Sequence, residues 1–209
     1  MIDYPRVKRL VDVVIAGSAL VLLSPLLGGI AVMIKLAGGG PALYRSARAG
    51  VNGRSFGMLK FRTMTTDAPD LRNPDGSTYS ASDDPRVTPI GRWLRRTSLD
   101  ELPQLWNVVK GDMSLVGPRP ELPDQIRQYS AHDRRRLDVR PGITGLAQVS
   151  GRNALTWQQR LALDVEYVNS MTFSGDVVLL LRTIPGVLGG RGVFGNDGSG
   201  ARSGTSRES

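Results

Sequence analysis

A long uncharged stretch near the N-terminus constrains this chain more than any other feature. Residues 13 to 34, VVIAGSALVLLSPLLGGIAVMI, form a run of 22 residues without a charged side chain. A helix of roughly 20 apolar residues is long enough to cross a bilayer. A signal peptide fits less well, because the stretch is longer than an h-region and no small-residue cleavage site follows it cleanly. By length alone, a plain transmembrane anchor is the favoured interpretation.

Two further features favour a helix that enters the membrane and returns to the same side. Ser24-Pro25 lies at the midpoint of the stretch, where proline removes a backbone hydrogen bond and kinks a helix. Basic residues flank both ends, so the positive-inside rule gives both ends a cytoplasmic character. We therefore expect a re-entrant membrane helix over residues 1–36, kinked at Ser24-Pro25. The flanking residues are Arg6, Lys8 and Arg9 on one side and Lys35, Arg45 and Arg48 on the other.

The remainder predicts a single cytoplasmic domain over residues 37–188, of the α+β class and mostly helical. Residues 38–64 favour a small β-hairpin, because VNGR contains the Asn-Gly turn signal. Residues 65–85 are polar and predict a long surface loop. The Gly/Ser-rich residues 189–209 predict a disordered tail. A short amphipathic helix is expected at PIGRWLRR, and further surrounding helices over about 99–110, 121–137, 156–170 and 175–188.

The amino-acid composition excludes several kinds of catalytic and metal-binding site. The chain has no cysteine, which excludes disulfides, thiolate metal sites and cysteine nucleophiles. Its one histidine, His132, stands in a polar run, so a histidine-based triad or multi-histidine metal site is not expected. The net charge of +8 and the pI near 10.4 suit an anionic partner, namely nucleic acid, anionic lipid or a phosphorylated substrate.

Two adjacent acids, Asp100 and Glu101, begin the segment SLDELPQLWNVVKGDMSLVGPRPELP. One interpretation is a capping box, in which Ser98 caps a helix and Glu101 reaches back to it. Pro103 complicates that interpretation, since proline inside a helix costs a hydrogen bond. The other interpretation is phosphoryl chemistry, in which carboxylates work among cations that neutralise phosphate oxygens. Arg119, held between two prolines, would then be a presented donor.

Three motifs follow one another behind the hydrophobic stretch: KFRTM (60–64), RRTSLDELPQLWNVVKGDMSLVGPRPE (95–121) and RPGITGLAQVSGRN (140–153). In this order they resemble the bacterial sugar transferase family, the monotopic polyprenol-phosphate phosphoglycosyltransferases. The resemblance runs from Lys8 to about Ile184. It is closest to the small single-domain members of the family.

This resemblance implies an activity. A sugar 1-phosphate passes from a UDP-sugar to undecaprenyl phosphate, UMP leaves, and surface polysaccharide or glycoconjugate synthesis begins. By similarity, Asp100 is the nucleophile that forms a covalent phosphosugar intermediate, and Glu101 is its partner. The resemblance also implies Mg²⁺ bound next to Asp100. Neither the sugar nor the pathway can be identified from the sequence.

The resemblance also implies a substrate site and a location. Its substrate-binding residues would be Lys60, Arg62, Arg95, Arg119, Arg140, Gly151, Arg152 and Asn153. The enzyme would lie in the inner (cytoplasmic) membrane as a monotopic protein, in contact with membrane lipids and with its catalytic domain facing the cytoplasm. The sequence leaves a homo-oligomer open.

A different class of protein, a membrane-anchored basic module that binds anionic lipid or nucleic acid, would also explain the charge and the N-terminus. It leaves the ordered motifs and the acid pair unexplained. The chain also lacks the aromatic-rich pattern of single-strand binders, so we expect no nucleic-acid partner.

Overall fold

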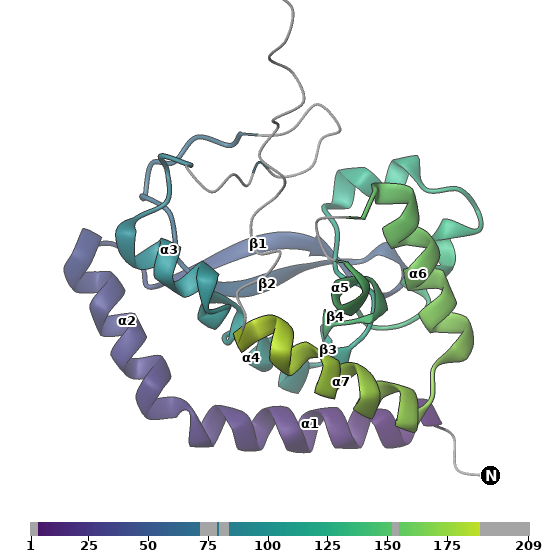
Figure 1. Cartoon of the computed structure of the whole chain (residues 1–209). Coiled ribbons are helices and arrows are strands. Elements are labelled where there is room, and N and C mark those ends of the chain that lie inside the picture. Colours follow the sequence, from purple (N-terminus) through teal and green to yellow (C-terminus); the bar gives the residue numbers. More distant parts are fainter. Residues whose placement is uncertain (1–3, 72–78, 80–83, 152–154, 189–209) are drawn as a thin grey trace, which may run out of the picture.

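The computed structural model describes residues 4–71, 79, 84–151 and 155–188 (Figure 1). Helices dominate it, as the sequence predicts, and the strands form two small two-stranded sheets. In Figure 1 the helix α1 runs beneath the domain, α2 rises from its end along the side of the domain towards α3, and the hairpin β1–β2 lies across the middle.

The uncharged stretch forms two helices, α1 (Tyr4–Leu22) and α2 (Ser24–Gly38), bent by 62° at Leu23. Pro25 lies in the first turn of α2, where its missing N–H needs no partner within that helix. The same missing N–H deprives the Val21 carbonyl of its helical partner, and the Ser24 hydroxyl donates to that carbonyl instead, at 2.8 Å. The predicted kink at Ser24-Pro25 is therefore confirmed, and its cause is local.

In the part of the chain that the structure describes, no single helix is long and apolar enough to span a membrane. The bent pair α1–α2 meets the length and composition criteria only when its two helices are taken together. Many apolar side chains of the pair are exposed, with Val21, Leu22 and Leu36 each at least 77% accessible. Within residues 4–71, 79, 84–151 and 155–188, no segment covers these side chains to explain their apolar character.

The hairpin prediction is confirmed. Strands β1 (Leu43–Ala49) and β2 (Ser55–Phe61) pair antiparallel around the turn of residues 50–54. Asn52 and Gly53 take positive φ values of 55° and 74°, which are the conformations that favour Asn and Gly. Tyr44 pairs with Lys60 in this register, so both side chains lie on the same face.

The helix expected over 99–110 is divided. A 3-10 turn (Leu99–Glu101) is followed by α4 (Gln104–Lys110), because Pro103 cannot donate within a continuous helix and instead begins the second one. Before them, α3 (Pro89–Arg96) forms where PIGRWLRR predicts it, and Thr88 caps it by accepting from the Gly91 N–H at 3.0 Å.

The continuous helix expected over 121–137 is wrong. Two separate 3-10 helices, Pro123–Gln128 and Asp133–Leu137, occupy that range. Tyr129, the residue that ends the first, is extended with φ −74° and ψ 132°. The helices expected near 156–170 and 175–188 are confirmed as α6 (Trp157–Ser170) and α7 (Phe173–Leu188), and α6 begins with a capping box between Thr156 and Gln159.

A short parallel pair of strands links two of the sequence motifs. Strand β3 (Ser114–Val116) pairs with β4 (Gly142–Thr144), and α5 (Leu146–Ser150) follows. A Cβ atom added at Gly142 would lie 2.1 Å from the Gly117 nitrogen, so only glycine permits this close backbone approach. The GITG motif thus holds the segment of Arg119 against β4.

The core has two apolar clusters. One joins α1, β2, α4, β3, α6 and α7, and the other joins α2 to the start of the hairpin and to α3. The members of the second cluster are Ile30, Ile34, Ala42, Phe61 and Leu94. Both helices of the bent pair therefore pack on the domain that carries the motifs.

Candidate active site

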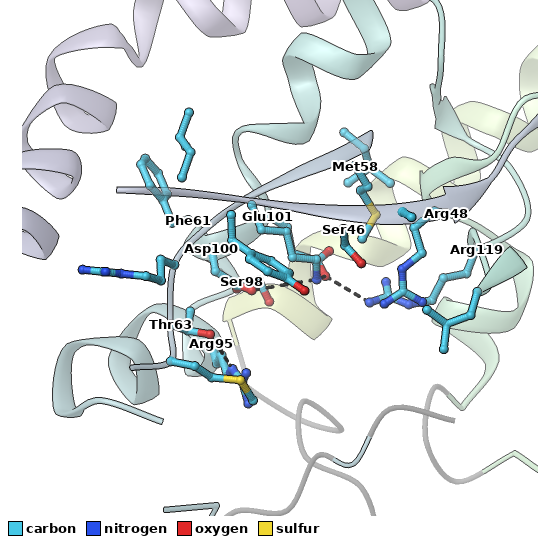
Figure 2. Close-up of a pocket in the computed structure, with 18 of the residues that line it drawn as sticks. Ser46, Arg48, Met58, Phe61, Thr63, Arg95, Ser98, Asp100, Glu101 and Arg119 are labelled. Atoms are coloured by element: carbon cyan, nitrogen blue, oxygen red, sulfur yellow. Dashed lines mark hydrogen bonds and ion pairs between the residues drawn. The ribbon is translucent and has the colours of Figure 1, made fainter. Parts of the chain in front are cut away.

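One large cavity, of about 1400 Å³, lies between the hairpin, the 3-10 turn Leu99–Glu101, the loop of Arg119 and the helices α5 and α6. Figure 2 shows Asp100 and Glu101 facing Arg48 and Arg119 across it. The volume is ample for a ligand of nucleotide-sugar size. The structure thus gathers residues from all three sequence motifs around a single space.

The backbone before the acid pair is unusual. Ser98 lies in the left-handed region, with φ 56° and ψ 15°, and its side chain caps no helix. The capping-box interpretation of SLDE is therefore wrong. The left-handed residue ends α3 sharply and turns the next residues, so that both carboxylates reach the cavity.

Glu101 is held by two cations. The Lys60 Nζ lies 2.7 Å from the Glu101 Oε1, and the Arg119 Nη2 lies 3.0 Å from the same oxygen. Burial alone would raise the pKa of Glu101, but the charges of Lys60 and Arg119 outweigh it and lower that pKa well below its usual range. Glu101 is therefore ionised at every pH at which the protein would work.

Asp100 is in the opposite situation. Its side chain is only 10% exposed, and among the described residues its carboxylate accepts no hydrogen bond. The nearest cation is the Lys60 Nζ, at 3.9 Å. Burial raises the pKa of Asp100 to about 6, with Lys60 opposing and the charge of Glu101 reinforcing that rise. Asp100 is a desolvated carboxylate with its oxygens free, which is the condition of a reactive group.

The loop that presents Arg119 is anchored from behind. The Arg119 carbonyl accepts from the Arg136 Nη2 at 2.7 Å, and Arg136 forms an ion pair with Asp164 of α6 at 2.5 Å. The side chains of Arg136 and Asp164 are 3% and 2% exposed. Arg136 also donates to the Tyr129 hydroxyl. Three side chains from other parts of the chain thus fix the backbone position of one arginine.

Arg95 and Arg62 also line the cavity. Helix α3 packs so closely on the KFRTM segment that a Cβ at Gly91 would lie 2.0 Å from the Thr63 carbonyl oxygen. This contact lets the Arg95 Nε donate to the Thr63 hydroxyl at 2.9 Å, as Figure 2 shows. The Arg62 guanidinium donates instead to the Gly39 carbonyl after α2, so it links the site to the bent helix pair.

Two of the remaining expected substrate residues, Arg140 and Gly151, do not line the cavity. The Arg140 Nε donates to the Gly111 carbonyl at 3.0 Å, away from the cavity wall, so the geometry gives no support to a substrate-binding role. Gly151 ends α5 and is not among the lining residues either. Arg152 and Asn153 lie outside the described residues.

Sequence reasoning missed Arg48, which lines the cavity from β1. A signal was available, because side chains alternate along a strand and residues directly opposite one another share a face. Once Tyr44 is paired with Lys60, the same face carries Ser46 and then Arg48. Knowing the register of the hairpin would have placed Arg48 on the same face as Lys60.

The oxygen donors in the cavity decide whether Mg²⁺ could bind there. Among the described residues, no group of three or more carboxylates or histidines is placed to hold a metal. Mg²⁺ at phosphoryl-transfer sites is, however, commonly held by one or two carboxylates together with substrate phosphates. The hydrogen-bond-free carboxylate of Asp100 fits that mode, whereas Glu101 is engaged by its two cations.

The fold and site define an enzyme built for phosphate-bearing substrates, with an acid pair set among cations next to a bent apolar helix pair. The chain belongs to the bacterial sugar transferase family, whose model matches residues 4–190. This agrees with the resemblance drawn from its three motifs.

Individual relatives support this membership. The chain is 42% identical over 198 residues to the exopolysaccharide production protein ExoY of Rhizobium meliloti, covering 90% of this chain and 88% of the relative. It is 44% identical over 191 residues to the UDP-glucose:undecaprenyl-phosphate glucose-1-phosphate transferase of Caulobacter vibrioides, covering 87% and 69%. It is also 41% identical over 202 residues to the undecaprenyl-phosphate glucose phosphotransferase of Komagataeibacter xylinus, covering 90% and 37%.

Proposed function

We propose that this protein transfers a sugar 1-phosphate from a UDP-sugar to undecaprenyl phosphate, giving a polyprenol diphosphate sugar and UMP. The names of the Caulobacter and Komagataeibacter relatives describe transfers of this kind. The observation that carries the proposal is the Asp100 carboxylate, which is desolvated and free of hydrogen bonds in a cavity lined with cations.

The first half of the reaction uses Asp100 as the nucleophile. A carboxylate oxygen of Asp100 attacks the β-phosphorus, a new phosphorus–oxygen bond forms, and the bond to the α-phosphate oxygen breaks to release UMP. Weak hydration makes the Asp100 carboxylate more reactive than one in water. Lys60, Arg95 and Arg119 stand where negative charge on the phosphates must be neutralised.

The second half regenerates the enzyme. A phosphate oxygen of undecaprenyl phosphate attacks the same phosphorus, and the bond to Asp100 breaks, which returns the free carboxylate. Glu101 stays ionised throughout and keeps Lys60 and Arg119 in position. Its role in this account is to orient the cations rather than to carry a proton.

Mg²⁺ bound at Asp100 would offset the charge of the diphosphate. Among the described residues neither oxygen of Asp100 accepts a hydrogen bond, whereas Lys60 and Arg119 both bind the Oε1 of Glu101. Lys60, Arg95 and Arg119 share the task of charge neutralisation from the other sides of the cavity.

The exposed apolar surface of α1 and α2 supports a placement in the membrane. We propose that residues 1–36 re-enter the inner membrane and that residues 37–188 form the catalytic domain on the cytoplasmic face. The 62° bend, the basic flanks and the packing of both helices on the domain support this arrangement. It brings a cavity for a soluble nucleotide next to the layer that holds the lipid acceptor.

The test is a UMP-release assay on detergent-solubilised protein with a panel of UDP-sugars, Mg²⁺ and undecaprenyl phosphate. We expect UMP with at least one sugar nucleotide, together with a lipid-linked sugar phosphate. If the protein binds anionic lipid but releases no UMP with any member of the panel, the proposal is wrong and a lipid-binding module is the better interpretation.

A further inference from the structure

Arg48 is a cation of the cavity wall that forms no ion pair with any residue the structure describes. Its side chain is half-buried in the cavity wall, and none of the described residues offers its guanidinium a hydrogen bond or an ion pair. The Nε atom is closed off from solvent and also lacks a partner. In Figure 2 the guanidinium lies beside that of Arg119, so two like charges approach each other in the same wall.

Other buried arginines of this chain show what a structural arginine looks like here. Arg86 pairs with Asp84 at 2.7 Å and donates to two carbonyl oxygens, and Arg136 pairs with Asp164 at 2.5 Å. Arg48 has no equivalent pairing. Burial and the neighbouring Arg119 lower the pKa of Arg48, so the folded protein holds this charge at a cost.

The charges nearby do not remove that cost. Glu101 is already engaged by Lys60 and Arg119, and Glu121 lies near enough to act on Arg48 electrostatically but forms no ion pair with it. The positive charge on the Arg48 side of the cavity is therefore not fully neutralised by the protein. A guanidinium has a planar fork of donors that matches two oxygens of a phosphate.

We propose that Arg48, together with the accessible edge of Arg119, forms a subsite for a phosphate group that enters the cavity. This inference rests on the proposed function. The phosphate has two sources, the diphosphate of the sugar nucleotide or the phosphate of the polyprenol. Both are anions that would supply the ion-pair partner that Arg48 lacks among the described residues.

The experiment compares Arg48→Gln with Arg45→Gln in the full-length protein in detergent. Arg45 is the matched control, because it lies on the same strand but packs over Gly57 and does not line the cavity. Isothermal titration measures the binding of UDP in one arm and of undecaprenyl phosphate in the other. We expect Arg48→Gln to bind at least one of them roughly 10- to 100-fold more weakly, as loss of a hydrogen bond to a charged group implies. Arg45→Gln should bind both as the wild type does.

The ligand that Arg48→Gln binds more weakly identifies the source of the phosphate. Arg48→Lys, which keeps the charge but loses the fork, should fall between the wild type and Arg48→Gln. Thermal unfolding without ligand supplies a further readout, because removing an uncompensated cation should leave the melting temperature unchanged or raise it. Unchanged affinity of Arg48→Gln for both ligands, whatever the melting temperature, would overturn the subsite while leaving the proposed function intact. If the wild type binds neither ligand and releases no UMP, the proposed function itself fails.

Discussion

Asp100 and Glu101 are neighbours in the chain, yet their surroundings shift their pKa values in opposite directions. Two cations share an oxygen of Glu101, while Asp100 loses water and gains no hydrogen bond from any described residue in return. Environment thus assigns different roles to two chemically similar groups. The sequence indicated that a pair was present, but which acid is free depends on distances to Lys60 and Arg119.

The first prediction concerns stability. A buried carboxylate with a raised pKa binds a proton more readily when folded, so the free energy of unfolding falls as the pH rises through the range between about 4 and 6. Asp100→Asn should therefore be about 1–3 kcal/mol more stable than the wild type at pH 8, with the difference vanishing near pH 4. Denaturant unfolding followed by tryptophan fluorescence at both pH values measures this.

Glu101→Gln is the matched comparison and should have the opposite sign. The lowered pKa of Glu101 means that its stabilising contribution is present above the ordinary pKa of a glutamate and is lost only at lower pH. At pH 8 the variant leaves Lys60 and Arg119 without their shared partner and should lose about 1–3 kcal/mol. Destabilisation of equal size in both variants would contradict the assigned roles.

The second prediction concerns the dependence of rate on pH. Only the ionised Asp100 can attack phosphorus, so kcat/KM for the UDP-sugar should fall about tenfold per pH unit below about pH 6. Steady-state UMP release between pH 5 and 9 gives the profile. A flat profile down to pH 5 would show that the free enzyme does not depend on a carboxylate with a raised pKa.

At the level of the elements, the position of the loop that carries Arg119 depends on residues far from it in sequence. Arg136 donates to the Arg119 carbonyl and pairs with Asp164 of α6 in a fully buried position. GPRP indicated a presented arginine, but nothing in the run DRRRL distinguishes Arg136 from its two neighbouring arginines. Only the tertiary contact with α6 does so.

The third prediction tests that anchor. Arg136→Met leaves Asp164 buried without its partner and should cost about 3–5 kcal/mol of stability. The double variant Arg136→Met/Asp164→Leu should recover most of it, because both charges are gone. Turnover should remain lowered by about 10- to 100-fold in the double variant, since Arg119 is no longer fixed from behind. Recovery of full activity together with stability would show that the anchor serves folding alone.

Some helices and strands could be predicted from the sequence and others could not. The kink at Ser24-Pro25, the Asn-Gly hairpin, α3, α6 and α7 were predictable because local chemistry decides them. The 3-10 helices between 123 and 137 and the parallel pair β3–β4 were not. Each of these depends on packing between distant segments, such as the contact of Gly142 with Gly117.

At the scale of the whole molecule, the bent helix pair is attached to the domain by a buried polar network. Asp176 of α7 accepts from Tyr4 and Lys8 of α1, each at 2.6 Å, and from Tyr167 of α6 at 2.8 Å. The Ser114 hydroxyl donates to Asp12 at 2.6 Å. Such links fix the angle between the domain and α1, and hence the height of the cavity above a membrane that receives α1 and α2.

The fourth prediction concerns topology. The chain has no native cysteine, so Ile2→Cys and Ser55→Cys can be introduced singly without background. Both should resist a membrane-impermeant thiol reagent in intact cells and react after permeabilisation, because a re-entrant pair leaves both positions in the cytoplasm. Reaction of Ile2→Cys alone in intact cells would indicate a spanning helix. Pro25→Ala, which restores an N–H for the Val21 carbonyl, should shift molecules towards that spanning form.

Trapping the covalent intermediate on Asp100 is the decisive experiment for the proposed mechanism. The enzyme is incubated with Mg²⁺ and a UDP-sugar labelled on the β-phosphate, without undecaprenyl phosphate, then quenched and mapped by peptide analysis. We predict label on the peptide that contains Asp100, UMP released in equal amount to enzyme, and neither in Asp100→Asn. Release of UMP only when the lipid acceptor is present, with no label on the protein, would contradict the account and reassign Asp100 to metal binding or to a base.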